Sequence, residues 1–452
     1  MDCVHFEQRN LIVALNDYPI NYFRKGTNMD ITLSPAKKCI SEIEAISSKS
    51  YVHRLLIAAA LSDQASTVKT NILSEDMKAT IDCLNAMGAD IKVKDEIIYV
   101  NPIAGILSGE KCEKAHLNPN ESGSTARFLL PAASVLCKQF TIEGHGKLPQ
   151  RPFGPVCECM RANGAVISSD FIPLEVSGEL RPGTYELPGN ISSQYITGLM
   201  YALPMLKGDS NIMLTTKLES KAYIDITLDV LNMFGIRVEP TENGYHIPGN
   251  QKYVAPDKMQ AQGDWSNAAF FLCMGAIAGE MTVTEIDATS PQGDKEILNI
   301  LKKFGAEVTI EETSVTVKQK ELKAIRAEVS EIPDLVPVLC VVAGLAEGTT
   351  VFENAGRLRI KESDRIETTK ALLQALGANL RAVEENGKVN LYIDGVKEYT
   401  GGEADSAEDH RIAMSAAVAA VRATAPVTIR GAEAVNKSYP GFFEDYKRVL
   451  GE

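Results

Sequence analysis

The sequence predicts an α/β protein of two domains, each built from three copies of one repeating unit. Three observations predict this fold class: the length of the chain, a recurring amphipathic helix that ends at glycine, and a recurring helix that is apolar on all sides. The chain has 452 residues, which is more than one hydrophobic core ordinarily serves, so two domains are expected. Two helix types that alternate along the chain then indicate a repeat.

The first recurring segment is an amphipathic helix followed by glycine and then by a strand. IDCLNAMGADI, TLDVLNMFGIRV and ILNILKKFGAEV are three of its copies. The glycines that end these helices are Gly88, Gly164, Gly235, Gly305, Gly377 and Gly451. By subtraction, successive glycines are 76, 71, 70, 72 and 74 positions apart. Because glycine readily adopts the left-handed conformation that ends a helix, each of these positions predicts a helix C-terminus.

The second recurring segment opens with small polar residues and then stays almost wholly apolar. SGSTARFLLPAA, DWSNAAFFLCMGA and IPDLVPVLCVVAG are three of its copies. Marker positions near the starts of the copies are Ser50, Ser124, Ser193, Ser266, Asp334 and Arg411. Their spacings of 74, 69, 73, 68 and 77 place them in alternation with the glycines. A helix without a polar face is a buried helix, so the sequence predicts six units of roughly 70 to 76 residues, each with one buried and one amphipathic helix.

The ends of the predicted domains are marked by composition. The polar stretch QKYVAPDKMQAQGD, residues 251–264, resembles a linker between the third and fourth units. MDITLSP, from Met29, has the form of a natural start that leads directly into a strand. Residues 1–28 lack the long apolar stretch of a signal peptide, and we expect them to be an N-terminal extension outside the fold.

The composition is that of an ordinary globular protein with an acidic balance. Hydrophobic residues make up 45% of the chain, and 46 Lys and Arg face 59 Asp and Glu, for a formal net charge of −13. That charge argues against binding to nucleic acid or to an anionic membrane. The longest apolar run, LVPVLCVVAGLA, is too short to span a bilayer. Nine scattered cysteines without zinc-site spacing predict reduced thiols in a cytoplasmic protein and no metal site.

Basic residues gather at the predicted N-termini of the apolar helices. Lys49 and Arg54, Arg127, and the pair His410 and Arg411 all lie there. A cation at this end of a helix opposes the helix dipole unless an anion binds between them. Further basic residues lie in predicted loops, at Arg151, Lys361, Arg365 and Lys437. We interpret the pattern as a cleft between two domains that holds one or two anionic small molecules; helix caps and ordinary surface ion pairs remain the alternatives.

Nine short motifs resemble those of the 5-enolpyruvylshikimate-3-phosphate synthase family in order and rough spacing. They are SKSYVHR, SGSTAR, QRPFGP, SSQY, SKAYIDIT, IPD, RIKESDR, DHRIAM and KSYPGFFED. The resemblance runs from about Met29 to the C-terminus. It implies a two-domain inside-out α/β barrel of six βαβαββ units, with helices inside and sheets outside. The implied domains are residues 47–261, and residues 29–46 together with 262–452, with the active site in the cleft between them.

The resemblance also implies an activity of the transferase class. The family transfers the enolpyruvyl (carboxyvinyl) group of phosphoenolpyruvate to the 5-hydroxyl of shikimate 3-phosphate, and phosphate is released by addition and elimination through a tetrahedral intermediate. This reaction belongs to the shikimate pathway of chorismate and aromatic amino-acid biosynthesis. The implied partners are the two small-molecule substrates, with no cofactor, nucleic acid or membrane. A cytoplasmic monomer is expected.

Site residues follow from the resemblance motif by motif. Shikimate 3-phosphate would be bound by Lys49, Ser50, Arg54, Ser192, Ser193, Gln194, Ser220, Tyr223, Asp334 and Lys361. Phosphoenolpyruvate would be bound by Lys49, Gly123, Arg151, Gln194, Arg365, Arg411 and Lys437. Arginine forks suit a ligand with a carboxylate and a phosphate, and a glycine lets the backbone approach the ligand.

Two carboxylates and a lysine would move the protons of this reaction. Asp334 is assigned to the shikimate hydroxyls and the 5-hydroxyl proton, and Glu362 with Lys49 to proton transfer at the enolpyruvyl carbon. An alternative for Asp334 is the N-cap of the apolar helix that follows it. Asp364, in the same charged motif as Glu362, is expected to orient an arginine.

Three features depart from the family pattern. Glu121-Ser122-Gly123-Ser124 stands where the family often has Asn, Ala or Ser, Gly and Thr. Arg357 replaces an asparagine that contacts the shikimate phosphate in some members. Residues 1–28 have no counterpart.

Two other functions compete with this interpretation. A related family transfers the same group to UDP-N-acetylglucosamine and uses a loop cysteine, but the corresponding residues 144–154 contain no cysteine. A non-catalytic or nucleic-acid-directed repeat protein is disfavoured by the net negative charge and by the carboxylates beside the basic helix starts.

Overall fold

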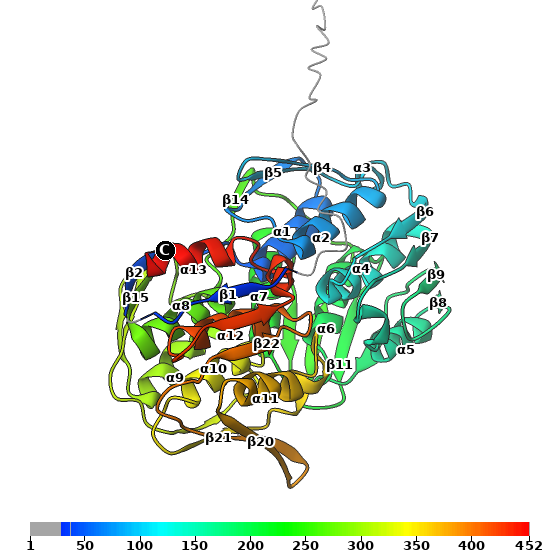
Figure 1. Cartoon of the computed structure of the whole chain (residues 1–452). Coiled ribbons are helices and arrows are strands. Elements are labelled where there is room, and N and C mark those ends of the chain that lie inside the picture. The colour runs from blue at the N-terminus through cyan, green and yellow to red at the C-terminus, as the bar shows by residue number, and fades with distance from the viewer. Residues whose placement is uncertain (1–28, 37, 452) are drawn as a thin grey trace, which may run out of the picture.

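The computed structural model describes residues 29–36 and 38–451, so the predicted extension at residues 1–28 lies outside the described residues. In the part of the chain that is described, helices form the interior and six sheets cover them (Figure 1). The predicted inside-out α/β architecture is therefore confirmed. None of the helices within the described residues is long and apolar enough to cross a membrane.

Buried hydrophobic side chains form two clusters that share no member. One contains residues between 51 and 261, and the other contains residues 33–46 together with residues 265–449. The predicted domain boundaries stay a prediction, and the two clusters lie on either side of them. Below, the first half means residues 47–261, and the second half means the described residues of 29–46 and 262–451.

Five of the six sheets repeat one arrangement, in which a parallel pair of strands is extended by two antiparallel strands. In the first half the spatial orders are β14 (Lys258–Gln260), β3 (Ser66–Lys69), β5 (Ile97–Asn101), β4 (Asp90–Lys94); β6 (Cys112–Leu117), β7 (Cys137–Ile142), β9 (Leu174–Gly178), β8 (Ala165–Ile167); and β10 (Thr184–Leu187), β11 (Ser210–Leu214), β13 (Gly244–Ile247), β12 (Glu239–Thr241). In the second half they are β2 (Cys39–Glu44), β15 (Gly279–Thr284), β17 (Ser314–Lys318), β16 (Glu307–Ile310); and β18 (Arg326–Glu328), β19 (Thr349–Glu353), β21 (Lys388–Asp394), β20 (Asn379–Glu385). The sixth sheet contains β1 (Ile31–Leu33), β23 (Val427–Arg430) and β22 (Gly402–Asp405).

The two predicted helix types alternate through these units. The apolar helices, almost wholly buried, are α1 (Lys49–Ala60), α4 (Gly123–Leu136), α6 (Ser193–Ala202), α8 (Trp265–Ala278), α10 (Val336–Ala343) and α12 (His410–Ala420). The amphipathic helices are α2 (Glu75–Ala86), α5 (Gly154–Ala162), α7 (Lys221–Met233), α9 (Ile297–Phe304), α11 (Arg365–Ala375) and α13 (Phe442–Leu450). The six glycines predicted to end them all have positive φ, from 72° to 107°, so this prediction is confirmed.

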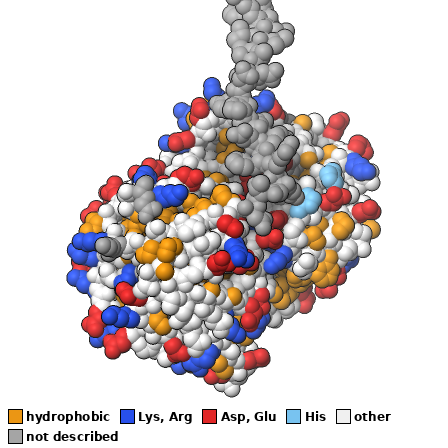
Figure 2. Space-filling model, viewed as in Figure 1, with side chains coloured by type: hydrophobic (Ala, Val, Ile, Leu, Met, Phe, Trp, Pro, Cys, Tyr) orange, Lys and Arg blue, Asp and Glu red, His pale blue; other side chains and the backbone are white. Residues whose placement is uncertain are grey.

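Short helical turns complete the described chain. They are α3 (Ala104–Ser108) and the 3-10 helices η1 (Leu148–Gln150), η2 (Leu203–Met205), η3 (Gly293–Glu296), η4 (Gly356–Ile360) and η5 (Ala432–Lys437). Several of them carry residues of the candidate site. On the face shown in Figure 2, acidic and basic side chains are interspersed over the described surface.

The chain crosses between the halves twice, and each crossing is preceded by a strand that completes a sheet. β2 comes early in the sequence but pairs in parallel with β15 of the second half, beside which it lies in Figure 1. β14 comes after the third unit but pairs with β3 of the first. The crossing segments bond each other, since Ser48 N donates to Gln262 O at 2.7 Å and Asp264 N donates to Ile46 O at 2.8 Å. Both crossings thus lie together at the junction of the halves.

Candidate active site

A pocket between the halves is lined by the starts of buried helices and by the loops beside them. The first half contributes Lys49, Ser50, Arg54, Ser124, Arg127, Phe128, Arg151, Pro152, Ile191, Ser192, Ser193, Gln194, Tyr195, Ser220 and Tyr223. The second half contributes Asp264, Ser266, Asp334, Arg357, Ile360, Lys361, Glu362 and Arg411. Most of the predicted site residues therefore meet in one pocket. The predicted residues that lie beside the pocket rather than on its wall are Gly123, Arg365 and Lys437.

Arg54 is held in one orientation by the first half. Its Nε donates to Thr227 Oγ1 at 2.8 Å, and its Nη2 donates to Tyr223 O at 3.0 Å. Its guanidinium lies 4.9 Å from the centroid of the Phe128 ring. Burial lowers the pKa of Arg54. A fork whose rotamer is already set loses little entropy when it binds an anion, so Arg54 is well placed for that role.

Arg127 is a pocket residue that the motif assignments left out. Its Nη1 donates to Gln194 Oε1 at 2.8 Å, and its guanidinium stacks 5.0 Å from the centroid of the Phe153 ring. Burial, followed by the charge of Arg151, lowers the pKa of Arg127 to about 10. The sequence signal that could have assigned Arg127 to the site is its position one turn after Gly123, at the start of the same helix. Arg127 orients Gln194, a residue predicted to contact both substrates.

Gly123 makes room for two guanidinium groups at the start of α4. A Cβ built on it would lie 2.6 Å from Arg151 Nη1 and 3.1 Å from Arg127 Nη1. Any larger residue would push the Arg151 side chain away from the helix N-terminus. The predicted approach of phosphoenolpyruvate to Gly123 stays a prediction, and the observed geometry adds Arg127 to its surroundings.

Asp334 lies among donors from both halves. Its Oδ1 accepts from Arg365 Nη1 at 2.6 Å and lies 3.3 Å from Lys361 Nζ. Its Oδ2 accepts from the Tyr223 hydroxyl of the first half at 3.1 Å. Burial raises the pKa of Asp334, but the charges of Lys361, Arg365 and Arg411 outweigh it and hold that pKa well below its ordinary value. Asp334 is therefore an ionised hydrogen-bond acceptor.

The alternative that Asp334 caps the following helix is wrong. α10 begins at Val336, and its N-cap residue is Leu335, which makes no side-chain cap. The turn before α10 instead directs the Asp334 carboxylate at the side chains of Tyr223 and Arg365.

Arg365 joins three carboxylates behind the pocket wall. Its side chain is 1% exposed, its Nη2 donates to Glu362 Oε2 at 2.7 Å, and its Nε donates to Asp409 Oδ2 at 2.8 Å. Burial raises the pKa of Glu362, but Arg365 and then Arg151 outweigh it and hold that pKa well below its ordinary value. The structure thus assigns Arg365 to holding Glu362 and Asp334, while its predicted contact with phosphoenolpyruvate stays a prediction.

Asp364 starts α11 and also holds an arginine. Its Oδ1 accepts from the backbone N–H groups of Ile366 at 3.1 Å and Glu367 at 3.3 Å. Its Oδ2 accepts from Arg359 Nη1 at 3.0 Å. The capping bonds explain why the charged motif passes directly into a helix.

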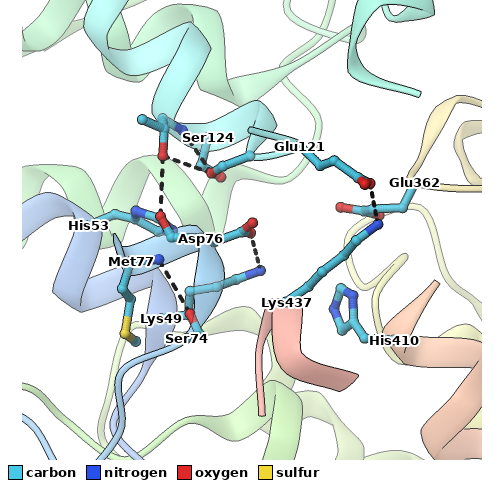
Figure 3. A network of polar contacts seen from close by, with 12 residues as sticks. Lys49, His53, Ser74, Asp76, Met77, Glu121, Ser124, Glu362, His410 and Lys437 are labelled. Carbon is cyan, nitrogen blue, oxygen red and sulfur yellow. Dashed lines mark hydrogen bonds and ion pairs between the residues drawn. The ribbon is translucent and has the colours of Figure 1, made fainter. Parts of the chain in front are cut away.

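Two of the three predicted site lysines, Lys49 and Lys437, are drawn in Figure 3, each paired with a carboxylate. Lys49 Nζ lies 3.0 Å from Asp76 Oδ2, and the backbone N–H of Lys49 donates to Asp264 Oδ2 of the second half at 3.0 Å. Lys437 Nζ lies 2.5 Å from Glu121 Oε2 across the junction. Each lysine is thereby fixed in position by the protein itself.

Arg357, which replaces a family asparagine, also spans the halves. Its Nη1 donates to Ser220 Oγ at 2.5 Å, and its Nε lies 3.4 Å from Glu219 Oε2. Ser220 and Arg357 both line the pocket. The replacement therefore places a guanidinium beside a serine predicted to bind the shikimate phosphate.

A family model described as EPSP synthase (3-phosphoshikimate 1-carboxyvinyltransferase) matches residues 33–446. The chain belongs to the EPSP synthase family. It is 40% identical over 420 residues to the 3-phosphoshikimate 1-carboxyvinyltransferase of Clostridium novyi (strain NT), which covers 91% of this chain and 95% of that protein. It is 42% identical over 417 residues to the protein of the same name from Clostridium acetobutylicum, with 91% and 95% covered.

A solved structure agrees with membership of the EPSP synthase family. The EPSP synthase from Acinetobacter baumannii superposes with a TM-score of 0.78 at 26% sequence identity, and the match covers 94% of this chain and 98% of that one. The family and the fold predicted from the nine motifs are thereby confirmed.

Proposed function

We propose that this enzyme transfers the enolpyruvyl group of phosphoenolpyruvate to the 5-hydroxyl of shikimate 3-phosphate, giving 5-enolpyruvylshikimate 3-phosphate and phosphate. The observation that carries the proposal is the pocket, in which Asp334 and Glu362 lie among basic side chains from both halves. Membership of the EPSP synthase family supports it. Charge-assisted bonds of this kind contribute about 1.5–3 kcal/mol each, so several of them can hold two anionic substrates together.

The first-half wall offers hydroxyl groups that suit a phosphorylated, hydroxyl-rich substrate. Ser192 caps α6 by accepting from Gln194 N, and Ser193 is the first residue of that helix. The N-terminus of a buried helix presents free N–H groups and a partial positive charge to a phosphate. Tyr223 of the first half and Lys361 of the second half line the same pocket, so shikimate 3-phosphate would contact both halves.

The addition step joins the two substrates. The 5-hydroxyl oxygen bonds to C2 of phosphoenolpyruvate, the hydroxyl proton leaves, and the methylene carbon C3 gains a proton. Asp334 is ionised, so its carboxylate can accept a hydrogen bond from the 5-hydroxyl, and it takes the proton as the oxygen bonds to C2 and the hydroxyl becomes acidic. Lys49 lines the same pocket as a cation paired with Asp76 and is suited to protonate C3. Holding both substrates in place supplies about 7–11 kcal/mol of the barrier in favourable cases.

The elimination step restores the double bond. The bond between C2 and the phosphate oxygen breaks, phosphate leaves, and one proton is removed from the new methyl group. Glu362 lines the pocket and is ionised, because Arg365 and Arg151 hold its pKa well below the ordinary value, so its carboxylate is free to take this proton. Arg365 fixes the direction of this carboxylate from behind.

Phosphate release tests the proposal directly. Purified enzyme with phosphoenolpyruvate and shikimate 3-phosphate is expected to release phosphate, whereas phosphoenolpyruvate with UDP-N-acetylglucosamine is not. Release with the sugar nucleotide alone would favour the related enolpyruvyl transferase, and release with neither would refute both. The predicted monomeric state and cytoplasmic location remain predictions, and light scattering after size-exclusion chromatography tests the first.

A further inference from the structure

The ion pair between Glu121 and Lys437 joins the two halves beside the pocket. Glu121 immediately precedes Ser122, the N-cap of α4 in the first half, and Lys437 ends η5 of the second half. The two side chains are 34% and 18% exposed. Figure 3 shows the Glu362 carboxylate directed toward the same place. Glu121 occupies a position where the family often has asparagine, so the predicted roles leave this pair unexplained.

The second half is shaped to hold the Lys437 ammonium. Lys437 Nζ donates to the carbonyl oxygen of Glu408 at 2.8 Å. That carbonyl is presented by a turn in which Ala407 and Glu408 have φ values of 52° and 58°. Consecutive residues other than glycine are strained in this left-handed region, and such strain persists where the surrounding structure requires it. An ammonium has three donors, so Glu121 and Glu408 leave one for a further acceptor.

The first half is shaped to hold the Glu121 carboxylate. The loop that carries Arg151 passes over it at Gly146, which has a φ of +56°. A Cβ at Gly146 would lie 2.4 Å from Glu121 Cδ, so only glycine allows this approach. The positive end of the α4 dipole also favours a carboxylate at this position.

We propose that Glu121 is an internal counter-ion for Lys437 and that the anionic substrate competes with it for the ammonium. The inference rests on the proposed function, in which Lys437 contacts phosphoenolpyruvate. An anion that binds at the ammonium is repelled by the neighbouring Glu121 carboxylate, so the pair stabilises the joined halves most while no anion is bound. Glu121 therefore weakens anion binding, and it favours an anion that gains further bonds, such as those to Arg151, over one that reaches Lys437 alone.

Glu121→Gln tests this inference, because it keeps the length and an acceptor oxygen but removes the charge. The KM for phosphoenolpyruvate, measured by phosphate release with shikimate 3-phosphate saturating, is expected to fall roughly fivefold, the effect of one partly exposed ion pair. The dissociation constant of shikimate 3-phosphate is expected to stay unchanged. Glu113→Gln is the matched control, since it removes an exposed ion pair with Lys138 on neighbouring strands of the same half. An unchanged or higher KM for phosphoenolpyruvate in Glu121→Gln overturns the inference.

A measurement without substrates separates this inference from the proposed function. Small-angle scattering of the enzyme alone is expected to give a larger radius of gyration for Glu121→Gln than for Glu113→Gln, with Glu121→Asp, which keeps the charge, between them. If the wild-type enzyme binds no phosphoenolpyruvate, the proposed function fails, and this comparison still decides the role of Glu121. Equal radii for the two Gln variants would then overturn it.

Discussion

Replacing Arg365 with methionine removes the one cation that three carboxylates share behind the pocket. The lost bonds are those to Asp334 at 2.6 Å, Glu362 at 2.7 Å and Asp409 at 2.8 Å. Asp409 is fully buried, with 0% of its side chain exposed, so its charge cannot turn to water. Breaking a buried ion pair by removing one partner costs about 3–5 kcal/mol. We expect Arg365→Met to lower the free energy of unfolding by about that amount at neutral pH.

The loss should depend on pH in a defined direction. In the wild-type fold the pKa values of Asp334 and Glu362 are held well below their ordinary values, so these groups stabilise the fold above their unfolded pKa and lose that effect as the pH falls through the folded pKa. Without Arg365, fewer cations oppose the effect of burial and both pKa values rise, so each carboxylate stabilises the fold less than it does in the wild type. Urea unfolding should therefore show a larger loss of stability at about pH 7 than at about pH 4, where the wild type is itself losing this stabilisation.

An exposed pair in the same motif provides the control. Arg359 Nη1 lies 3.0 Å from Asp364 Oδ2, with 44% of the arginine side chain exposed. Arg359→Met is expected to cost less than about 1 kcal/mol, because exposed ion pairs are weak. If Arg365→Met lost less than about 1 kcal/mol of unfolding free energy, or lost the same amount at both pH values, the role of Arg365 as the buried partner of three carboxylates would be refuted.

Three further predictions concern the reaction and the closing of the halves. Glu362→Gln should lower turnover by about two to four orders of magnitude in the phosphate-release assay while calorimetry still detects shikimate 3-phosphate binding; near-normal turnover would contradict its role as a base. Gly123→Ala places a Cβ 2.6 Å from Arg151 Nη1 and should raise KM for phosphoenolpyruvate severalfold, and an unchanged KM would show that the arginine moves freely. Trp265, buried beside a crossing segment with its indole N–H donating to Asp287 O, should change its emission when both substrates compact the molecule in small-angle scattering; compaction with constant emission would count against it.

The repeat was predictable because its signals are local. A glycine after an amphipathic helix acts through its own φ, and an apolar helix start acts through composition, so neither depends on distant residues. The pairing of a late strand with an early sheet has no local signal. Residues 251–264 read as a polar linker, yet they contain β14, which completes the first sheet by pairing with β3. A three-residue edge strand, exposed at both ends, carries too little periodicity to be distinguished from a linker.

The membership of the site was predictable, but the pairing inside it was not. Motifs brought the residue types together, and the pocket contains most of them. Which cation meets which carboxylate depends on how the heads of helices from different units converge. For that reason Arg365 was assigned to a substrate although it bonds three carboxylates, and Arg127 was left without a ligand although it lines the pocket.

The pairing also explains how an acidic chain can hold anions. Several cations in or beside the pocket are paired with a carboxylate of the protein: Lys49 with Asp76, Lys361 with Asp334, Arg357 with Glu219, and Lys437 with Glu121. Each internal pair fixes its cation in position but must be shared or broken when an anion arrives. The free-energy cost of breaking a pair depends on how buried its carboxylate is. A buried carboxylate that loses its partner is costly, whereas a partly exposed one is rehydrated. Glu121, at 34% exposure, can return to water, whereas Asp409, at 0%, cannot; substrate binding should therefore rearrange the Lys437 pair and leave the Arg365 pairs intact.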